Sequence, residues 1–311
     1  MAQRLVSGDL AIGIDLGGTQ IRAALIDRDG KIHKRVADLT KAGSGPDVVM
    51  GQIAGLTAKV IEGVAPEKVM GAGVSSPGPL DTENGVALCI PTMAGFVEFP
   101  LRARLAQHLG LPVFLENDGI AAAIGEWTFG AARGFANAVY VTVSTGIGGG
   151  VIAGGRVLRG RRGMAGHVGH MSFVQGGTRC ACGNHGCFEA YGSGTAFTSR
   201  ASAAAGKPMT AAEVFAGAAA GDSLAQALVN EEAEILGQGF ASLMHLFSPD
   251  ILVMGGGLSN QFAMLESGIA KAVQASAMPP FRDTPVVPAA LGSNSGLIGA
   301  ANLVFAPHGH A

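Results

Sequence analysis

The feature that most constrains the fold of this chain is a strand, glycine turn, strand unit that occurs twice. Residues 10–26 run from one apolar segment through Gly17-Gly18 into another, and Asp29-Gly30 then favours a two-residue hairpin. Residues 138–158 repeat this order, with a glycine-rich turn at 144–150 and a second hairpin at Gly154-Gly155. The repeat predicts two similar lobes that face one cleft, each with its own glycine turn.

Apolar periodicity predicts alternating strands and helices around these units. We expect helices over 46–64 and 99–109, strands over 69–74 and 112–115, an alanine-rich helix from 119, helices from about 193 to 247, strands over 251–254 and 285–290, and a last helix after 296. The order of the elements predicts an α/β fold.

Composition excludes several classes of function. The chain has 21 Lys and Arg against 23 Asp and Glu, so it has no basic excess with which to neutralise a nucleic acid backbone. It has no long uncharged apolar run for a membrane span, and the first residues do not resemble a signal peptide. We therefore expect a cytoplasmic protein that has neither nucleic acid nor a membrane as its partner.

The segment Asp15-Leu16-Gly17-Gly18-Thr19 has the features of an anion-binding turn. Its glycines let backbone N–H groups face an anion without a side chain in the way. Asp15 ends a buried strand, where a carboxylate is unfavourable unless a cation or hydrogen bonds offset it. A nucleotide with its Mg²⁺ would do so, and a tight hairpin with an Asx turn is the alternative.

Further glycine-rich turns follow other strands. The hydroxyls and backbone N–H groups of Ser144, Thr145 and Gly146 suit phosphate oxygens. The run Gly255-Gly256-Gly257 ends a third strand, and residues 292–299 form a fourth glycine-rich turn. Four such turns at strand ends, in a duplicated arrangement, predict a nucleotide cleft between the lobes.

The Asn117-Asp118 pair is the candidate catalytic site. It follows an apolar strand, where α/β proteins place their chemistry, and a carboxylate there can accept a proton from an attacking hydroxyl. The alternative interpretation is a helix N-cap.

The spacing of His170, Cys180, Cys182 and Cys187 is typical of a metal site. Three thiolates and one imidazole complete a tetrahedral Zn²⁺ site with no open position, which indicates a structural metal. Free thiols or a redox pair are the alternative. The basic run over 159–163 is either a solvated loop or a contact for nucleotide phosphates.

These motifs together resemble the repressor, open reading frame, kinase (ROK) family of sugar kinases, from Asp15 to the glycine-rich turn near Gly296. The segment from Cys180 to Glu189 carries the family signature. The resemblance implies the actin-like ATPase (ribonuclease H-like) fold, with two lobes around a cleft and a structural zinc in the larger lobe. It implies a small lobe of residues 1–118 plus 297–311 and a large lobe of residues 119–296.

The resemblance also assigns roles to single residues. The ATP and Mg²⁺ site would comprise Asp15, Gly17, Gly18, Thr19, Ser144, Thr145, Gly146, Gly255, Gly256 and Gly257. Asp118 would be the catalytic base, and the sugar would meet Gly78, Thr92, Asn117, His167, His170 and Glu189. His170 would also ligate zinc. The family further implies a homodimer.

One departure from the family pattern bears on the substrate. Most glucose-directed members carry a glutamate where this chain has His167. The variant is similar to bacterial N-acetylmannosamine kinases, which implies 6-phosphorylation of N-acetyl-D-mannosamine, with glucose or N-acetylglucosamine as alternatives. A transcriptional repressor of the same family is a further alternative, but it would carry a DNA-binding domain, for which we find no space ahead of Asp15.

Overall fold

Residues 8–306, which the computed structural model describes, hold two five-stranded sheets with the same strand arrangement. The first sheet has the order β3-β2-β1-β4-β8, and the second has the order β11-β10-β9-β12-β13. In each sheet the first three strands are antiparallel neighbours, and the remaining pairs are parallel. The predicted internal repeat is therefore confirmed.

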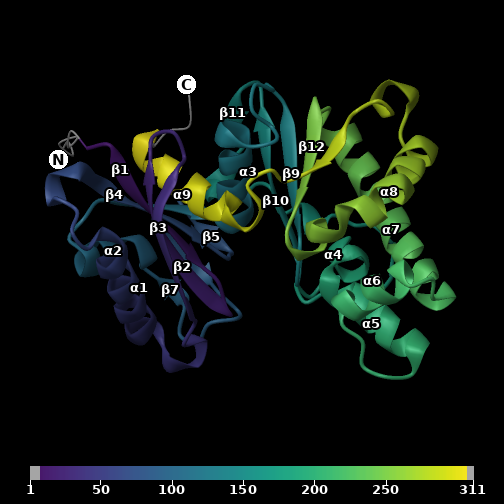
Figure 1. The fold of residues 1–311 in the computed structure, drawn as a ribbon, viewed down its shortest axis with the longest axis horizontal. Coiled ribbons are helices and arrows are strands. Elements are labelled where there is room, and N and C mark those ends of the chain that lie inside the picture. Colours follow the sequence, from purple (N-terminus) through teal and green to yellow (C-terminus); the bar gives the residue numbers. More distant parts are fainter. Residues whose placement is uncertain (1–7, 307–311) are drawn as a thin grey trace.

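Helices cover both faces of the first sheet (Figure 1). Its strands are β1 (Leu10–Leu16), β2 (Gln20–Asp27), β3 (Ile32–Leu39), β4 (Val69–Ser76) and β8 (Val113–Asn117). The helices α1 (Pro46–Ile61) and α2 (Leu101–Leu109) share one apolar core with the strands, and α9 (Ser295–Phe305) packs on the opposite face. The last helix of the described residues thereby returns to the first sheet.

The second sheet is covered by α3 (Asp118–Phe129) on one face and by five helices between residues 189 and 276 on the other. Its strands are β9 (Ala138–Val143), β10 (Ile147–Ala153), β11 (Arg156–Val157), β12 (Ile251–Gly255) and β13 (Val286–Pro288). The covering helices are α4 (Glu189–Gly192), α5 (Gly194–Ala205), α6 (Ala211–Ala219), α7 (Ser223–Phe247) and α8 (Phe262–Ser276).

The helices α3 and α9 pack against each other between the two sheets (Figure 1). Their backbones meet at glycines, since a Cβ on Gly299 would lie 1.7 Å from the carbonyl oxygen of Ala121. The buried Glu126 carboxylate of α3 accepts hydrogen bonds from the backbone N–H groups of Ala290 and Leu291 and from the Ser295 hydroxyl. This connection joins the two halves.

Three features differ from the sequence prediction. The small sheet of β5 (Leu80–Asp81), β6 (Val86–Cys89) and β7 (Val97–Phe99) was not predicted, and neither was α8. The predicted glycine turn over 144–150 is shorter, because β10 begins at Ile147 and includes Gly148, Gly149 and Gly150. These glycines leave room for neighbouring backbones, since a Cβ on Gly150 would lie 2.9 Å from the carbonyl oxygen of Gly119.

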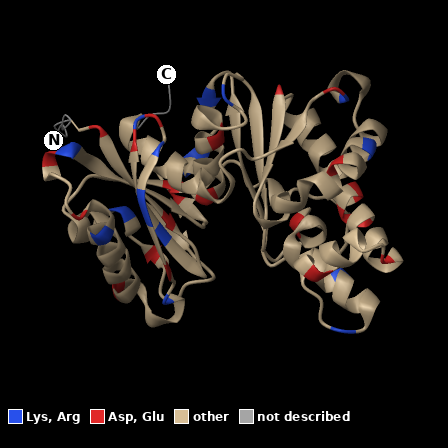
Figure 2. Cartoon of the chain, in the orientation of Figure 1, with Lys and Arg blue, Asp and Glu red and all other residues tan. Residues whose placement is uncertain are grey.

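Charged residues of both signs are interspersed over both halves (Figure 2). None of the helices within residues 8–306 combines the length and the apolar character that a membrane span requires.

Candidate active site and metal centre

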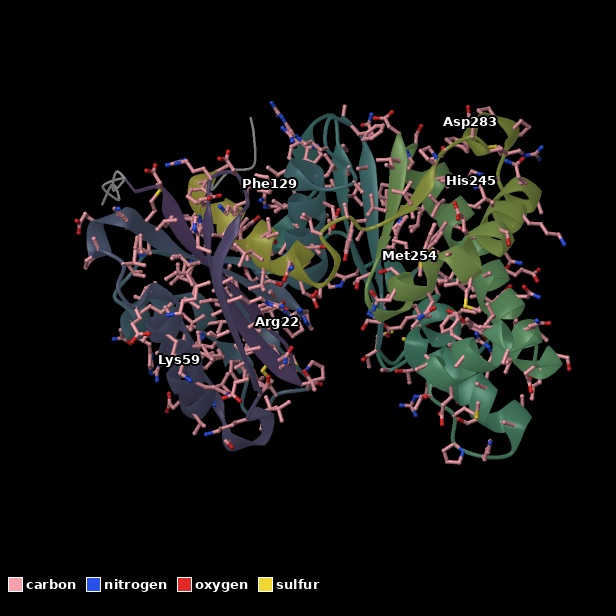
Figure 3. The ribbon with its side chains drawn as sticks, viewed as in Figure 1. Arg22, Lys59, Phe129, His245, Met254 and Asp283 are labelled. Atoms are coloured by element: carbon pink, nitrogen blue, oxygen red, sulfur yellow. The ribbon has the colours of Figure 1, made fainter. Side chains whose placement is uncertain are left out.

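The Asp15 carboxylate is compensated inside the protein. One of its oxygens is paired with the guanidinium of Arg22 on the neighbouring strand β2, and the other accepts a hydrogen bond of 3.0 Å from the Ser75 hydroxyl on β4. Arg22 also donates to the carbonyl oxygen of Ser293, in the loop before α9, at 2.7 Å. It lies at the side of the first sheet toward the second half (Figure 3). Arg22 was not predicted, although the predicted hairpin over residues 10–26 places it directly across from Asp15.

The first glycine turn has the tight geometry that its sequence predicts. The N–H of Gly17 donates to the carbonyl oxygen of Gln20 at 3.0 Å, which closes the β1–β2 hairpin. Thr92 packs on the turn so closely that a Cβ on Gly18 would lie 2.7 Å from its hydroxyl. Thr92 and Gly18 are therefore neighbours, and Thr19 is exposed beside them.

The second turn, Ser144 to Gly146, presents its hydroxyls to solvent. Ser144 and Thr145 are exposed, and the N–H of Ser144 donates to the carbonyl oxygen of Gly146 at 2.9 Å. The Glu189 carboxylate accepts from the N–H of Ile147 at 2.8 Å and leaves no room for a side chain at position 146. Glu189 thus lies against this turn.

The third turn lies beside the second. A Cβ on Gly257 would be 3.8 Å from the Ser144 hydroxyl, and a Cβ on Gly256, which has φ of +85°, would be 2.4 Å from the carbonyl oxygen of Val143. Gly255 ends β12 against the ring of Tyr140. Gly255 and Gly256 therefore let the ends of β9 and β12 lie in close contact.

The Asn117-Asp118 pair lies where β8 passes into α3. The Asn117 side chain accepts a hydrogen bond of 3.0 Å from the N–H of Gly119, so the alternative interpretation as an N-cap describes Asn117 correctly. The helix begins at Asp118, one residue earlier than expected. Gly78 lies next to this pair, because a Cβ there would be 3.4 Å from the Asn117 amide nitrogen.

Asp118 combines access to solvent with a perturbed carboxyl. The residue is exposed, yet the protein atoms around its carboxyl displace water and raise its pKa to about 6, and the Asp15 carboxylate adds to the rise. The hydrogen bonds with Gly119 and Asn117 act in the opposite direction. A carboxyl of this kind is ionised at pH 7 and is still basic enough to accept a proton from an alcohol.

Three backbone segments converge around Gly149 of β10. A Cβ on Gly119 of α3 would lie 2.5 Å from the carbonyl oxygen of Gly149, and a Cβ on Gly166 would lie 2.8 Å from the same atom. A Cβ on Gly149 itself would touch Val168. The start of α3 and the segment that contains His167 are therefore held against the same strand residue.

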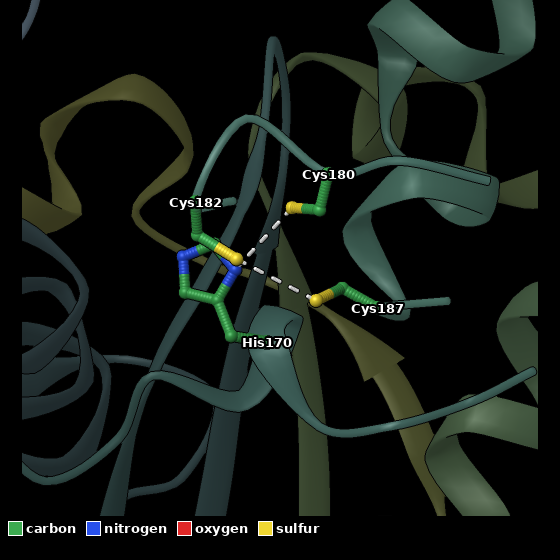
Figure 4. Close-up of side chains that lie close together, drawn as sticks. All are labelled: His170, Cys180, Cys182 and Cys187. Atoms are coloured by element: carbon green, nitrogen blue, oxygen red, sulfur yellow. Dashed lines mark hydrogen bonds between the residues drawn. The ribbon is translucent and has the colours of Figure 1, made fainter. Parts of the chain in front are cut away.

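The four predicted zinc ligands lie together (Figure 4). Each offers one atom, and those atoms are all within 4.8 Å of one another. The Sγ atoms of Cys182 and Cys187 are 3.6 Å apart, and Cys180 Sγ is 3.7 Å from His170 Nδ1. A tetrahedral zinc site separates its ligand atoms by roughly 3.4–3.8 Å, whereas a disulfide needs about 2.05 Å. The donor set fits Zn²⁺ and does not form a disulfide.

His167 lies beside the metal cluster. Its ring is 6.3 Å from that of His170 and roughly parallel to it. Burial lowers the pKa of His167, and His170 lowers it further.

The comparison with known proteins decides the family. A model of the ROK family matches residues 11–306 of the chain. The chain belongs to the ROK family. The matching pair of sheets is accordingly the actin-like ATPase fold that the resemblance to this family implies.

Relatives within the ROK family differ in their substrates. The glucokinase of Thermotoga maritima is 36% identical over 94% of this chain and 96% of its own length. The N-acetylmannosamine kinase of Shigella boydii is 36% identical over 79% of this chain and 82% of its own length. The structure of a ROK glucokinase from Streptomyces griseus, in complex with glucose and AMPPNP, has a TM-score of 0.82 at 33% identity and covers 94% of this chain and 98% of the other.

Proposed function

We propose that this chain is an ATP-dependent sugar kinase that phosphorylates the 6-hydroxyl of a hexose, with N-acetyl-D-mannosamine as the first candidate. The observation that carries the proposal is the Asp118 carboxyl, which is exposed, has a pKa raised to about 6, and lies next to Asn117 and Gly78. Catalysis by such a base contributes about 10²–10⁴ in rate.

In the proposed reaction, Asp118 accepts the proton of the sugar 6-hydroxyl. The sugar oxygen then forms a bond to the γ-phosphorus of ATP while the bond from that phosphorus to the bridging oxygen breaks, and ADP leaves. Asn117 and Gly78 would contact the sugar near the base. His167, His170, Glu189 and Thr92 complete the proposed sugar site.

The glycine turns would hold ATP. The backbone N–H groups of Gly18 and Thr19 would face phosphate oxygens in the turn that the Gly17–Gln20 hydrogen bond closes, and Ser144 and Thr145, which precede Gly146, add exposed hydroxyls. Gly255, Gly256 and Gly257 would receive the adenosine. Mg²⁺, bound with the nucleotide near Asp15, would supply positive charge to the phosphates. Since Asp15 already has Arg22 as its counter-ion, we expect it to act on the metal through water.

The zinc has a structural role in this proposal. His170, Cys180, Cys182 and Cys187 would fill all four positions, which leaves none for a reacting water. The metal would instead order the segment from His170 to Glu189, so that both of these side chains reach the sugar.

The choice of sugar rests on His167. A carboxylate at this position could accept hydrogen bonds from two sugar hydroxyls, whereas an imidazole is shorter and offers a different donor pattern. The glucokinases of Thermotoga maritima and Streptomyces griseus favour glucose as the second candidate. N-acetylglucosamine is the third.

The remaining parts of the proposal concern the whole molecule. Residues 1–118 plus 297–311 would form the small lobe, residues 119–296 would form the large lobe, and the lobes would close on the sugar. We also propose a homodimer and a cytoplasmic location, where ATP is available and thiols stay reduced.

A coupled ADP-release assay tests this function. It would compare N-acetylmannosamine, N-acetylglucosamine, glucose, mannose and fructose on the parent protein and on His167→Glu. We expect N-acetylmannosamine to give the highest kcat/KM, and the variant to shift the ratio toward glucose. A parent that prefers glucose would contradict the sugar assignment. ATP hydrolysis that does not depend on any sugar would contradict the kinase assignment.

A further inference from the structure

The basic run over residues 159–163, here called the basic segment, does not lie free in solvent. Arg159 Nε donates to Glu116 Oε2 at 2.9 Å. The backbone of Arg162 makes two further hydrogen bonds. Its carbonyl oxygen accepts from the N–H of Thr82 at 3.0 Å, and the N–H of Arg162 donates to Glu83 Oε1 at 3.2 Å. The segment follows β11 of the second sheet and is therefore docked on the first half of the chain.

Glu116 is the buried end of this contact. Its side chain is 2% exposed, and it is the residue directly before Asn117. One carboxylate oxygen accepts from Arg159, and the other accepts from the N–H of Asn117 at 3.1 Å. The carboxylate therefore joins the basic segment to the backbone at the end of β8. A buried carboxylate of this kind depends on its partner, because its charge is otherwise uncompensated.

The backbone of the basic segment is held in an unfavourable shape. Arg162 has φ of +59°, a backbone conformation that residues other than glycine rarely adopt. Gly163 follows with φ of +75°, and a Cβ there would lie 1.8 Å from the Thr82 hydroxyl. Such a conformation persists only where the surroundings determine it. The docking is thus a built contact between the two halves.

Each of the two segments joined by this contact continues along the chain into residues of the proposed sugar site. Glu116 is followed by Asn117 and Asp118, and the basic segment runs on through Gly166 to His167. Gly119 and Gly166 meet again at the carbonyl oxygen of Gly149. The base and the histidine segment are therefore connected twice, once through the Arg159–Glu116 pair and once through β10.

We propose that Arg159 and Glu116 are a positioning pair that fixes the Asn117-Asp118 pair relative to the His167 segment. The pair acts through these neighbours and touches no reacting atom. This inference rests on the proposed function, in which Asp118 is the base and His167 faces the sugar.

The pair makes a specific prediction about kinetics. In Arg159→Gln, kcat/KM for the sugar should fall roughly 10- to 100-fold, since small misplacements of a reacting group have effects of this size. KM for ATP should change by less than about twofold, because the basic segment would bind no phosphate. Arg161→Gln removes an exposed charge from the same segment and is the matched control, with the kinetics of the parent. Unchanged sugar kinetics in Arg159→Gln, or a change confined to the KM for ATP, would overturn the proposal.

A double variant separates positioning from mere stabilisation. Glu116→Leu combined with Arg159→Met replaces the ion pair by apolar side chains, and such replacements often leave stability intact. No acceptor then remains in the pair for the N–H of Asn117. We expect a thermal midpoint near that of the parent together with sugar kinetics as weak as in Arg159→Gln. Sugar kinetics that recover along with stability would overturn a positioning role.

Hydrogen exchange of the ligand-free protein tests the pair without any reaction. Amides of residues 116–119 and 82–83 should exchange faster in Arg159→Gln than in the parent and in Arg161→Gln. Equal exchange rates in all three proteins would overturn the proposal that Arg159 and Glu116 act as a positioning pair. A parent that phosphorylates no sugar would instead contradict the proposed function, and the exchange result would still decide whether Arg159 holds Glu116 and its neighbours in place.

Discussion

At the scale of single residues, the position of Asp118 sets its chemistry. The carboxyl lies at the first residue of α3, has the Asp15 carboxylate in its neighbourhood, and has a pKa raised to about 6 mainly by loss of hydration. The sequence indicates an acid at a strand end. It does not indicate Ser75, which compensates Asp15 together with Arg22, because a partner on the parallel strand β4 depends on the register of the sheet.

Asp118→Asn should remove the base and keep the shape of the site. We expect kcat to fall at least ~10²-fold while the sugar dissociation constant changes little. Steady-state assays and sugar titrations by calorimetry would measure the two quantities. The same change replaces a poorly hydrated carboxylate with a neutral amide, so we expect the thermal midpoint of unfolding at pH 7 to stay level or to rise. Turnover close to that of the parent would reject Asp118 as the base.

The pH dependence follows from the sign of the same shift. The folded-state pKa of Asp118 is raised, so the base takes up a proton as the pH falls through about 6, well above the usual range of an aspartate. We expect kcat/KM for the sugar to be nearly flat from about pH 7 to pH 8, to reach half of its maximum near pH 6, and to decline about tenfold per pH unit below that. A profile in which kcat/KM stays constant down to pH 4.5 would contradict this.

At the scale of elements, the segment from His170 to Glu189 ties the metal cluster to the second turn. Glu189 Oε1 lies 3.7 Å from Cys180 Sγ, and its other oxygen accepts from the N–H of Ile147. The sequence predicts the ligands from spacing alone, because a tetrahedral site needs only these residue types close together. It does not predict the small sheet of β5, β6 and β7, whose strands are too short for a periodic pattern.

Removal of the metal should loosen this segment. In Cys182→Ser, or after treatment with a strong chelator, we expect less than one zinc per chain, a lower thermal midpoint and a weaker sugar affinity. The reason is that a structural zinc contributes its binding free energy to folding. Elemental analysis, thermal unfolding and sugar titration measure these effects. Cys89→Ser lies outside the cluster and is the control. A metal-free protein with full activity would refute the zinc assignment.

At the scale of the whole molecule, duplication explains what can be predicted. The strand, turn, strand units at residues 10–26 and 138–158 predict two similar sheets, because each apolar strand needs neighbours and each glycine turn fixes a hairpin. The connection between the sheets is different. It depends on the packing of α3 on α9 and on the buried Glu126, which have no periodic signal in the sequence.

Glu126→Ala should weaken this connection. The carboxylate accepts hydrogen bonds from Ala290 and Leu291 ahead of α9 and from Ser295 at its first residue, so its removal leaves donors without an acceptor. We expect the free energy of unfolding to fall by roughly 2–4 kcal/mol. Urea unfolding measures the change, and Glu234→Ala, at an exposed position of α7, is the control. Equal stabilities of the two variants would show that Glu126 does not join the halves.

The meeting of Gly119, Gly149 and Gly166 has a consequence for protein engineering. None of the three can gain even a methyl group without pushing main-chain atoms apart. A library that seeks a new acceptor specificity should leave these positions constant and vary the side chains around them, such as Thr92 and His167. The substrate range of such variants would then depend on the varied side chains, because the backbone at the three glycines stays unchanged.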